Sequence, residues 1–210
     1  MHNVLLPTAY LPPISWMALA SRSDEIFIEV HETYPKQTYR NRCNIAASGG
    51  KFDLIVPVVR VDGNHTKTLD VQIDNSTSWQ KMHWRSILSA YNKTPYFIFY
   101  RDLFEPVYMR KFVHLLDLNA ELLQVLLKIF KIKSEVSFTT EYDSKSQMAD
   151  FRNSFRPHKP QRADFQYYLP RYIQAFESRY GFLPDLSILD ILFNLGPDSA
   201  TYLSAVVPLK

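Results

Sequence analysis

Residues 3–30, NVLLPTAYLPPISWMALASRSDEIFIEV, decide the fold because they place a strand, a short helix and a second strand in immediate succession. The apolar start NVLL leads through prolines into ISWMALAS, for which we predict a short helix. In EIFIEV, the apolar residues Ile26, Ile28 and Val30 fall at every second position, which is the pattern of a β-strand. This order of elements indicates an α/β fold.

Composition limits the classes of protein that the chain can belong to. Its 210 residues suffice for one domain with a substantial core. With 46% hydrophobic residues, 21% charged residues and a net charge of +3, it is neither a disordered tail nor a strongly basic nucleic-acid binder, so a nucleic-acid partner is not expected. No apolar run is long enough to span a membrane, the N-terminus lacks the basic start of a signal peptide, and Cys43 is the one cysteine. We therefore expect a cytoplasmic protein.

The rest of the chain continues the α/β pattern. RNRCNIA and FDLIVPVV, on either side of the turn ASGG, predict a β-hairpin, and EVSFTTEY predicts a later strand. One helix is expected from Ser78 until Pro95 ends it, and a long one over roughly 110–131. Further helices are expected in the segments LPRYIQAFESRYG and LSILDILFN. We predict one domain over residues 1–210, with a mixed parallel and antiparallel sheet, a strand-rich N-terminal half and a helical C-terminal half. The polar residues 143–166 are predicted to form a mobile loop or lid.

A basic stretch precedes the predicted hairpin. If residues 36–45, KQTYRNRCNI, form a strand, then Lys36, Arg40 and Arg42 share one face, and Tyr39 and Asn41 lie on the other. Guanidinium groups side by side are suited to a phosphate, pyrophosphate or carboxylate. The alternative is a solvated face of a hairpin, since charge clusters of this size are common on protein surfaces.

Two histidines are candidates for acid–base chemistry. His31, beside Glu32, follows the strand EIFIEV, and ligands of α/β sheets gather where strands end. His83 lies on the helical stretch WQKMHWRS, in which Lys81 and Arg85 are four residues apart and would accept an anion between them. The alternative for His83 is a hydrogen-bonded, partly buried histidine.

A polar stripe crosses the apolar C-terminal segment FLPDLSILDILFN. Ser187, Asp190 and Asn194 fall on one helical face and either line a cleft or cap the helix. Phosphate-loop, serine-hydrolase and metal-binding motifs are absent from the sequence, which therefore names no metal and no cofactor.

Four stretches of the chain, in order, resemble the WbqC-like protein family. They are LPTAYLPPISW, HETYPKQTYRNRC, SWQKMHWRSILSAYNKTPYF and FLPDLSILDILFN. The resemblance implies a role in surface polysaccharide biosynthesis, where members have been proposed to transfer acyl or aminoacyl groups to amino sugars. One departure is that SKSQMADFRNSFRPHKPQRADFQYY replaces a glycine-containing segment of longer members.

The resemblance and the polar motifs together give a functional hypothesis. A small anionic ligand, such as a nucleotide sugar, would be bound, with His31, His83 and Asp190 as candidate catalytic groups. The candidate substrate-binding residues are Lys36, Tyr39, Arg40, Asn41, Arg42, Arg85, Ser187 and Asn194. The alternative is a non-catalytic binding or scaffold protein of envelope assembly, which the replaced segment favours. The sequence predicts no oligomeric state.

Overall fold

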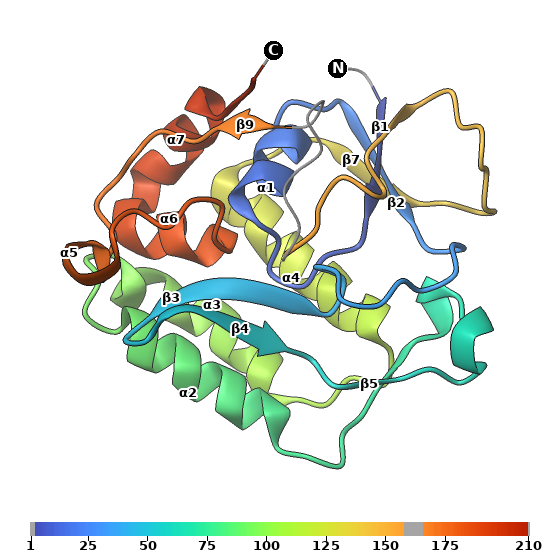
Figure 1. The fold of residues 1–210 in the computed structure, drawn as a ribbon, viewed down its shortest axis with the longest axis horizontal. Helices are drawn as coiled ribbons and strands as arrows, with labels where there is room; N and C mark the ends of the chain where they lie inside the picture. The colour runs from blue at the N-terminus through green and yellow to red at the C-terminus, as the bar shows by residue number, and fades with distance from the viewer. Residues whose placement is uncertain (1–2, 158–165, 210) are drawn as a thin grey trace.

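A four-stranded parallel sheet organises the molecule, which is described here by a computed structural model covering residues 3–157 and 166–209 (Figure 1). The strand order is β7-β2-β1-β8, and every neighbouring pair is parallel. The strands are β1 Asn3–Pro7, β2 Glu25–Glu29, β7 Glu135–Phe138 and β8 Ala149–Asp150. The predicted strand, helix and strand of residues 3–30 are thus confirmed as the centre of the fold.

The helix α1 (Ile14–Ala20) connects β1 to β2, and all of its residues are buried. Proline is tolerated where a helix begins, because the first N–H groups of a helix have no partner within it, so Pro13 can precede α1 directly. The helix α4 (Leu115–Phe130) lies on the same face of the sheet, since Trp16 of α1 and Leu123 of α4 line one pocket. One face of the sheet is therefore covered by α1, from the connection between β1 and β2, and by α4, from the connection between β2 and β7.

The predicted hairpin is present as a separate antiparallel pair, β3 (Arg42–Ala47) and β4 (Gly50–Ile55). Figure 1 shows it running alongside the helices α2 (Trp79–Tyr91) and α3 (Phe97–Met109). The expected strand over residues 36–45 is wrong for its first half, because β3 begins only at Arg42. Gln37 has a φ of 57°, in the left-handed region, which a continuous strand does not contain.

The single long helix expected over roughly 110–131 is shorter than predicted, and a second helix precedes it. The chain leaves α3 at Met109, takes an extended conformation at Arg110 and begins α4 at Leu115. Sequence reasoning did not predict α3, in which Pro106 lies inside the helix. Over residues 169–181, where a full helix was expected, only the single turn α5 (Glu177–Tyr180) is helical.

Short elements complete the described residues. The C-terminal region contains α6 (Ile188–Leu195), as predicted, and α7 (Ser199–Ala205). The remaining elements are β5 Val58–Val59, β6 Gln72–Ile73, β9 Tyr167–Tyr168, β10 Val207–Pro208, and the 3-10 turns Gly63–His65, Thr68–Asp70 and Gly196–Asp198. The α/β class with parallel and antiparallel pairing is confirmed. None of the helices described has the length and apolar character needed to cross a membrane.

The described part of the segment 143–166 packs into the fold. β8 pairs with β1, and Arg152 and Phe155, which follow it, are buried. Residues 158–165 lie outside the described residues, so a mobile loop or lid stays a prediction.

Gly196, at the end of α6, gives a test of this packing. Its φ is +56°, and a Cβ at this position would collide with the ring of Tyr96. We expect Gly196→Ala to lower the free energy of unfolding by about 2–4 kcal/mol, from left-handed strain and overpacking together. Urea denaturation would measure it. Gly63→Ala is the matched control, because Gly63 also has a positive φ but open space around its Cβ position. Equal losses in the two variants would contradict the steric explanation.

Candidate functional site

The carboxyl ends of β1 and β8 mark the place where a ligand site is expected. From β1 the chain crosses to β2 and then to β7 on one side, and β8 returns on the other side of β1. In open α/β sheets, ligands bind outside the carboxyl ends of strands at such a switch point. Here the loop after β2 (residues 30–41) meets the loop after β8 (residues 151–157).

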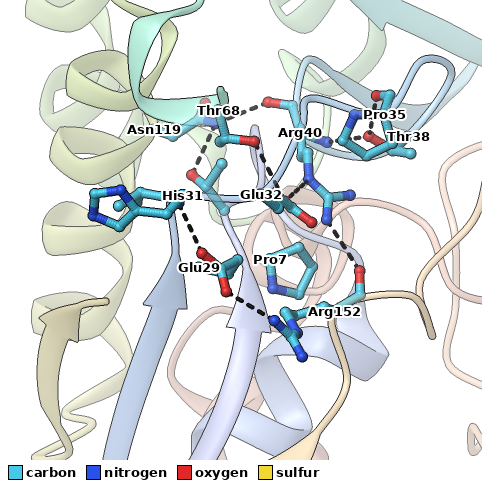
Figure 2. Close-up of polar contacts among 12 residues, drawn as sticks. Pro7, Glu29, His31, Glu32, Pro35, Thr38, Arg40, Thr68, Asn119 and Arg152 are labelled. Carbon is cyan, nitrogen blue, oxygen red and sulfur yellow. Dashed lines mark hydrogen bonds and ion pairs between the residues drawn. The ribbon is translucent and has the colours of Figure 1, made fainter. Parts of the chain in front are cut away.

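Arg40 connects these loops through a buried side chain (Figure 2). Its side chain is 2% exposed, and its Nε donates to Glu32 Oε1 at 2.6 Å. Its Nη2 donates to the carbonyl of Arg152 at 3.1 Å, while Asn119 donates to the carbonyl of Arg40 at 2.8 Å. Burial raises the pKa of Glu32 although Arg40 favours the charged form. The Arg40 guanidinium is therefore fixed in place by groups from separate parts of the chain.

Arg152 is held even more fully. Its Nη1 donates to Glu29 Oε2 at 2.9 Å, and its Nε and Nη2 form a forked contact with Asp150. The guanidinium also lies 4.8 Å from the ring centroid of Tyr142. Glu29 is fully buried, and its second oxygen accepts from Thr139 at 3.0 Å. The ends of β2, β7 and β8 are thus joined by one charged network.

A pocket of about 330 Å³, which we call the arginine pocket, opens beside these two arginines. Its described lining residues are Pro35, Lys36, Gln37, Thr38, Arg40, Arg152, Asn153, Phe155 and Arg156. None of these is acidic, and Lys36 and Arg156 are exposed cations. Within the described chain, no hydrogen bond engages Nη1 of Arg40. The arrangement can bind an anion through one fixed guanidinium and two exposed cationic side chains.

The predicted basic face does not form as one surface. Lys36 and Arg40 meet at the arginine pocket, but Arg42 lies beside Asp53 on the hairpin, with Nη1 3.7 Å from Oδ2. Arg85 is exposed on α2 and does not line this pocket.

The other predicted binding residues of this stretch are buried. The hydroxyl of Tyr39 donates to Asn44 at 3.1 Å, and the Asn41 side chain donates to the carbonyl of Val56 at 2.9 Å. Both bonds hold the start of the hairpin, so their binding role stays a prediction.

His31 lies at the predicted sheet edge. Its backbone N–H donates to Glu29 Oε1 at 2.7 Å. Figure 2 shows its ring directed away from Arg40 and Arg152. Glu32, the next residue, is the one that contacts Arg40. A catalytic role for His31 stays a prediction.

His83 lies in the core. Its Nδ1 is 2.9 Å from the hydroxyl of Tyr10, and its ring packs edge-on against Trp79. Burial lowers the pKa of His83 to about 4, so the imidazole is neutral at neutral pH. This geometry matches the hydrogen-bonded histidine weighed above; its catalytic role stays a prediction.

Asp190 is the centre of a second buried network. Its carboxyl group accepts hydrogen bonds from Tyr172 at 2.6 Å, Tyr91 at 2.9 Å and Gln174 at 3.1 Å. Ser187 caps α6, accepting from the N–H of Leu189.

Asn194 donates to the backbone carbonyl of Asp190 at 2.7 Å and lines a different pocket, of about 550 Å³. The three residues of the predicted stripe therefore share α6, but they do not line the arginine pocket.

Four residues of the site were not identified from the sequence: Glu29, Arg152, Arg156 and Asn119. Arg152 and Arg156 belong to a basic part of the segment 143–166. The sequence showed that this segment carries positive charge, but not where it lies in the fold. Asn119 is an amide on the buried face of α4, which is otherwise apolar. Such a group needs a partner, and that need was the available signal.

Comparisons with known proteins agree with the family resemblance. A profile of the WbqC-like protein family matches residues 8–155, so the chain belongs to this family. A curated relative, "Uncharacterized protein Rv1507c" of Mycobacterium tuberculosis strain H37Rv, is 26% identical over 226 residues, covering 95% of this chain and 96% of the relative. No solved structure matches.

Removing Arg40 should be costly for stability. We expect Arg40→Gln to lower the free energy of unfolding by about 3–5 kcal/mol, because the Glu32 carboxylate is left buried without its partner. Chemical denaturation measures the loss, and the double variant Glu32→Gln/Arg40→Gln should recover part of it. Lys36→Gln, at the same pocket but exposed, is the control. An Arg40→Gln variant as stable as the wild type would contradict the importance of the buried pair.

Asp190 should make stability depend on pH. Burial raises its pKa above the unfolded value of about 3.9, so the folded chain binds this proton more tightly. The stabilisation is complete below about pH 4 and is lost as pH rises through the folded-state pKa. We therefore expect the stability of the wild type relative to Asp190→Asn to fall as pH rises above about 4. Tyr172→Phe, which keeps the carboxyl group, should retain the pH dependence; a constant difference between wild type and Asp190→Asn would refute the assignment.

Proposed function

We propose that this protein binds a small anionic molecule, of the kind of a phosphorylated or nucleotide-linked sugar, in the arginine pocket. The observation that carries the proposal is the buried guanidinium of Arg40, held with Nη1 unengaged by the described chain beside Lys36, Arg152 and Arg156. A fixed guanidinium binds phosphate or carboxylate oxygens without losing side-chain freedom.

The size and position of the pocket support a small organic anion. Its volume of about 330 Å³ exceeds the space that inorganic phosphate needs and falls in the range of small-molecule sites. It also lies at the switch point of the parallel sheet. The charges of Arg152 are engaged by Glu29 and Asp150, so this residue contributes mainly by shaping the pocket wall and holding Arg40.

Nucleic acid fits the described surface less well. Such binding would need a continuous basic face that includes Arg40 and Arg42. Arg40 is buried, and Arg42 lies beside Asp53.

A transfer reaction is the role that the family resemblance adds. In it, the anion would anchor an amino sugar that receives an acyl or aminoacyl group. The described lining of the arginine pocket contains no histidine, cysteine or carboxylate. This composition favours the alternative, a binding protein of envelope assembly, over catalysis by the pocket lining itself. His31 follows β2 at the same edge of the sheet, but its ring is directed away from both arginines, so it would act as a base only on a ligand that extends beyond the pocket.

Isothermal titration calorimetry would test the proposal with uridine diphosphate glucose, glucose 1-phosphate and inorganic phosphate, and with uncharged glucose for comparison. We expect Lys36→Gln/Arg156→Gln to weaken binding of the phosphorylated probes about tenfold, because two charge-assisted contacts are lost. Both residues are exposed, so the melting temperature should not change.

A matched charge control separates the pocket from the net charge of the protein. Lys93→Gln/Lys128→Gln removes the same two charges at exposed positions that do not line the arginine pocket. It should bind as the wild type does. Equal affinity in all three proteins, or equal weakening in both variants, would reject the pocket as the anion site.

A further inference from the structure

The outward side of α3 is apolar, which is the reverse of the pattern expected of a surface helix. In such helices the apolar stripe faces the core and polar residues face water. The inward side of α3 follows this rule, since Tyr108 stacks on Trp84 of α2 and Phe104 packs edge-on against Phe193 of α6. The exposed residues of the helix, which we call the α3 face, are Ile98, Phe99, Asp102, Leu103, Pro106 and Met109.

The α3 face is one continuous surface rather than a set of scattered side chains. Its members are spaced by one, three or four positions, so they fall on one side of the helix. Phe99 is 71% exposed, an unusual state for a phenylalanine ring. The apolar surface extends beyond the end of the helix through the exposed residues Met82 of α2 and Val113. Contiguous apolar surface of this kind marks an interaction site.

The start of α2 and the end of α3 lie together, which brings Met82 beside the α3 face. The side chain of Gln80 donates to the backbone carbonyl of Arg110. Figure 1 shows the two helices running side by side below the hairpin.

Two opposite charges belong to this surface. Asp102 lies within the α3 face, and Arg110 directly follows the helix. Both side chains are exposed, and each has a partner within the chain: Asp102 accepts from Arg101 at 3.0 Å, and Arg110 contacts Glu121 of α4. Exposed ion pairs contribute little stability, so these charges can take part in a new contact at small cost.

We propose that the α3 face binds the α3 face of a second copy of this protein, in a two-fold symmetric pair with antiparallel helices. Asp102 and Arg110 lie four positions on either side of Pro106. A two-fold axis near Pro106 therefore brings Asp102 of each copy near Arg110 of the other. Rows of residues spaced by four run alongside one another when two helices cross at about 50°.

Self-complementarity is what selects a second copy as the occupant. A two-fold interface places one surface against itself, so its apolar residues must meet apolar residues and each charge must meet its opposite. The α3 face with Arg110 meets both conditions. A stable interface buries about 800 Å² per partner, more than one helix provides, so Met82 and Val113 are expected to contribute and the pair to be weak.

Other occupants fit less well. A membrane would receive the carboxylate of Asp102 among its acyl chains, where a charge is costly. A small molecule needs a concave site, whereas the α3 face is the convex side of a helix and lines neither the arginine pocket nor the pocket beside Asn194. The proposed pairing is independent of the proposed anion site for the same reason.

Sedimentation velocity over about a hundredfold range of protein concentration would test the pairing. We expect the wild type to pass from monomer to dimer as its concentration rises. Asp102→Arg and Arg110→Asp should each weaken the dimer at least about tenfold, because two symmetry-related contacts become repulsive. The double variant Asp102→Arg/Arg110→Asp should restore the dimer, since it exchanges the two charges and recreates the pair.

A matched pair of variants tests the apolar contribution. Phe99→Ser should weaken the dimer, whereas Ile173→Ser removes an even more exposed apolar side chain, 83% exposed, outside the α3 face and should leave the dimer unchanged. Thermal melting confirms that the variants fold.

Four outcomes would overturn the proposal. They are a wild type that stays monomeric at every concentration, equal effects of Phe99→Ser and Ile173→Ser, a double charge variant that does not recover the dimer, and co-sedimentation of the monomer with phosphatidylglycerol vesicles that Phe99→Ser abolishes. The last result would identify a membrane as the occupant instead.

Discussion

The buried ion pair between Arg40 and Glu32 is the interaction on which the sheet edge depends. Through its guanidinium and its carbonyl, Arg40 contacts the start of the loop after β2, the loop after β8 and the first half of α4. Burying two charges is expensive, and an apolar pair of similar volume is often equally stable. The contribution of this pair is therefore better understood as positioning: it fixes where three separate segments meet and which way a guanidinium faces.

The same logic separates the polar groups of the molecule into two kinds. Asp190 accepts hydrogen bonds from Tyr91, Tyr172 and Gln174, and these bonds join α6 to α2 and to the segment before α5. His83 is likewise enclosed by Tyr10 and Trp79. These groups are satisfied by the protein itself. At the arginine pocket, by contrast, Nη1 of Arg40 has no hydrogen-bond partner among the described residues, so the protein itself does not satisfy every polar group there.

Local patterns predicted the elements better than they predicted the site. Alternation in residues 25–30 identified β2, and the turn ASGG identified the hairpin, because both signals are carried by neighbouring residues. The basic stretch misled for a physical reason: Gln37 interrupts the strand, so Arg40 turns inward while Arg42 stays on the hairpin. Arg152 and Glu29, which form an ion pair, are 123 positions apart in the sequence. Helix and strand periodicity relates only residues that are close in sequence, so it could not predict this contact.

The shortness of β8 has its own consequence. Only Val4 and Leu5 of β1 pair with it, so this edge of the sheet is held by few backbone hydrogen bonds and by the side chain of Arg152. Edge segments of this kind open locally at a lower free energy than the core. Since the residues after β8 also form a wall of the arginine pocket, fraying of this edge of the sheet would remove part of the pocket wall at the same time. The shape of the pocket therefore depends on how well this short strand stays paired to the sheet.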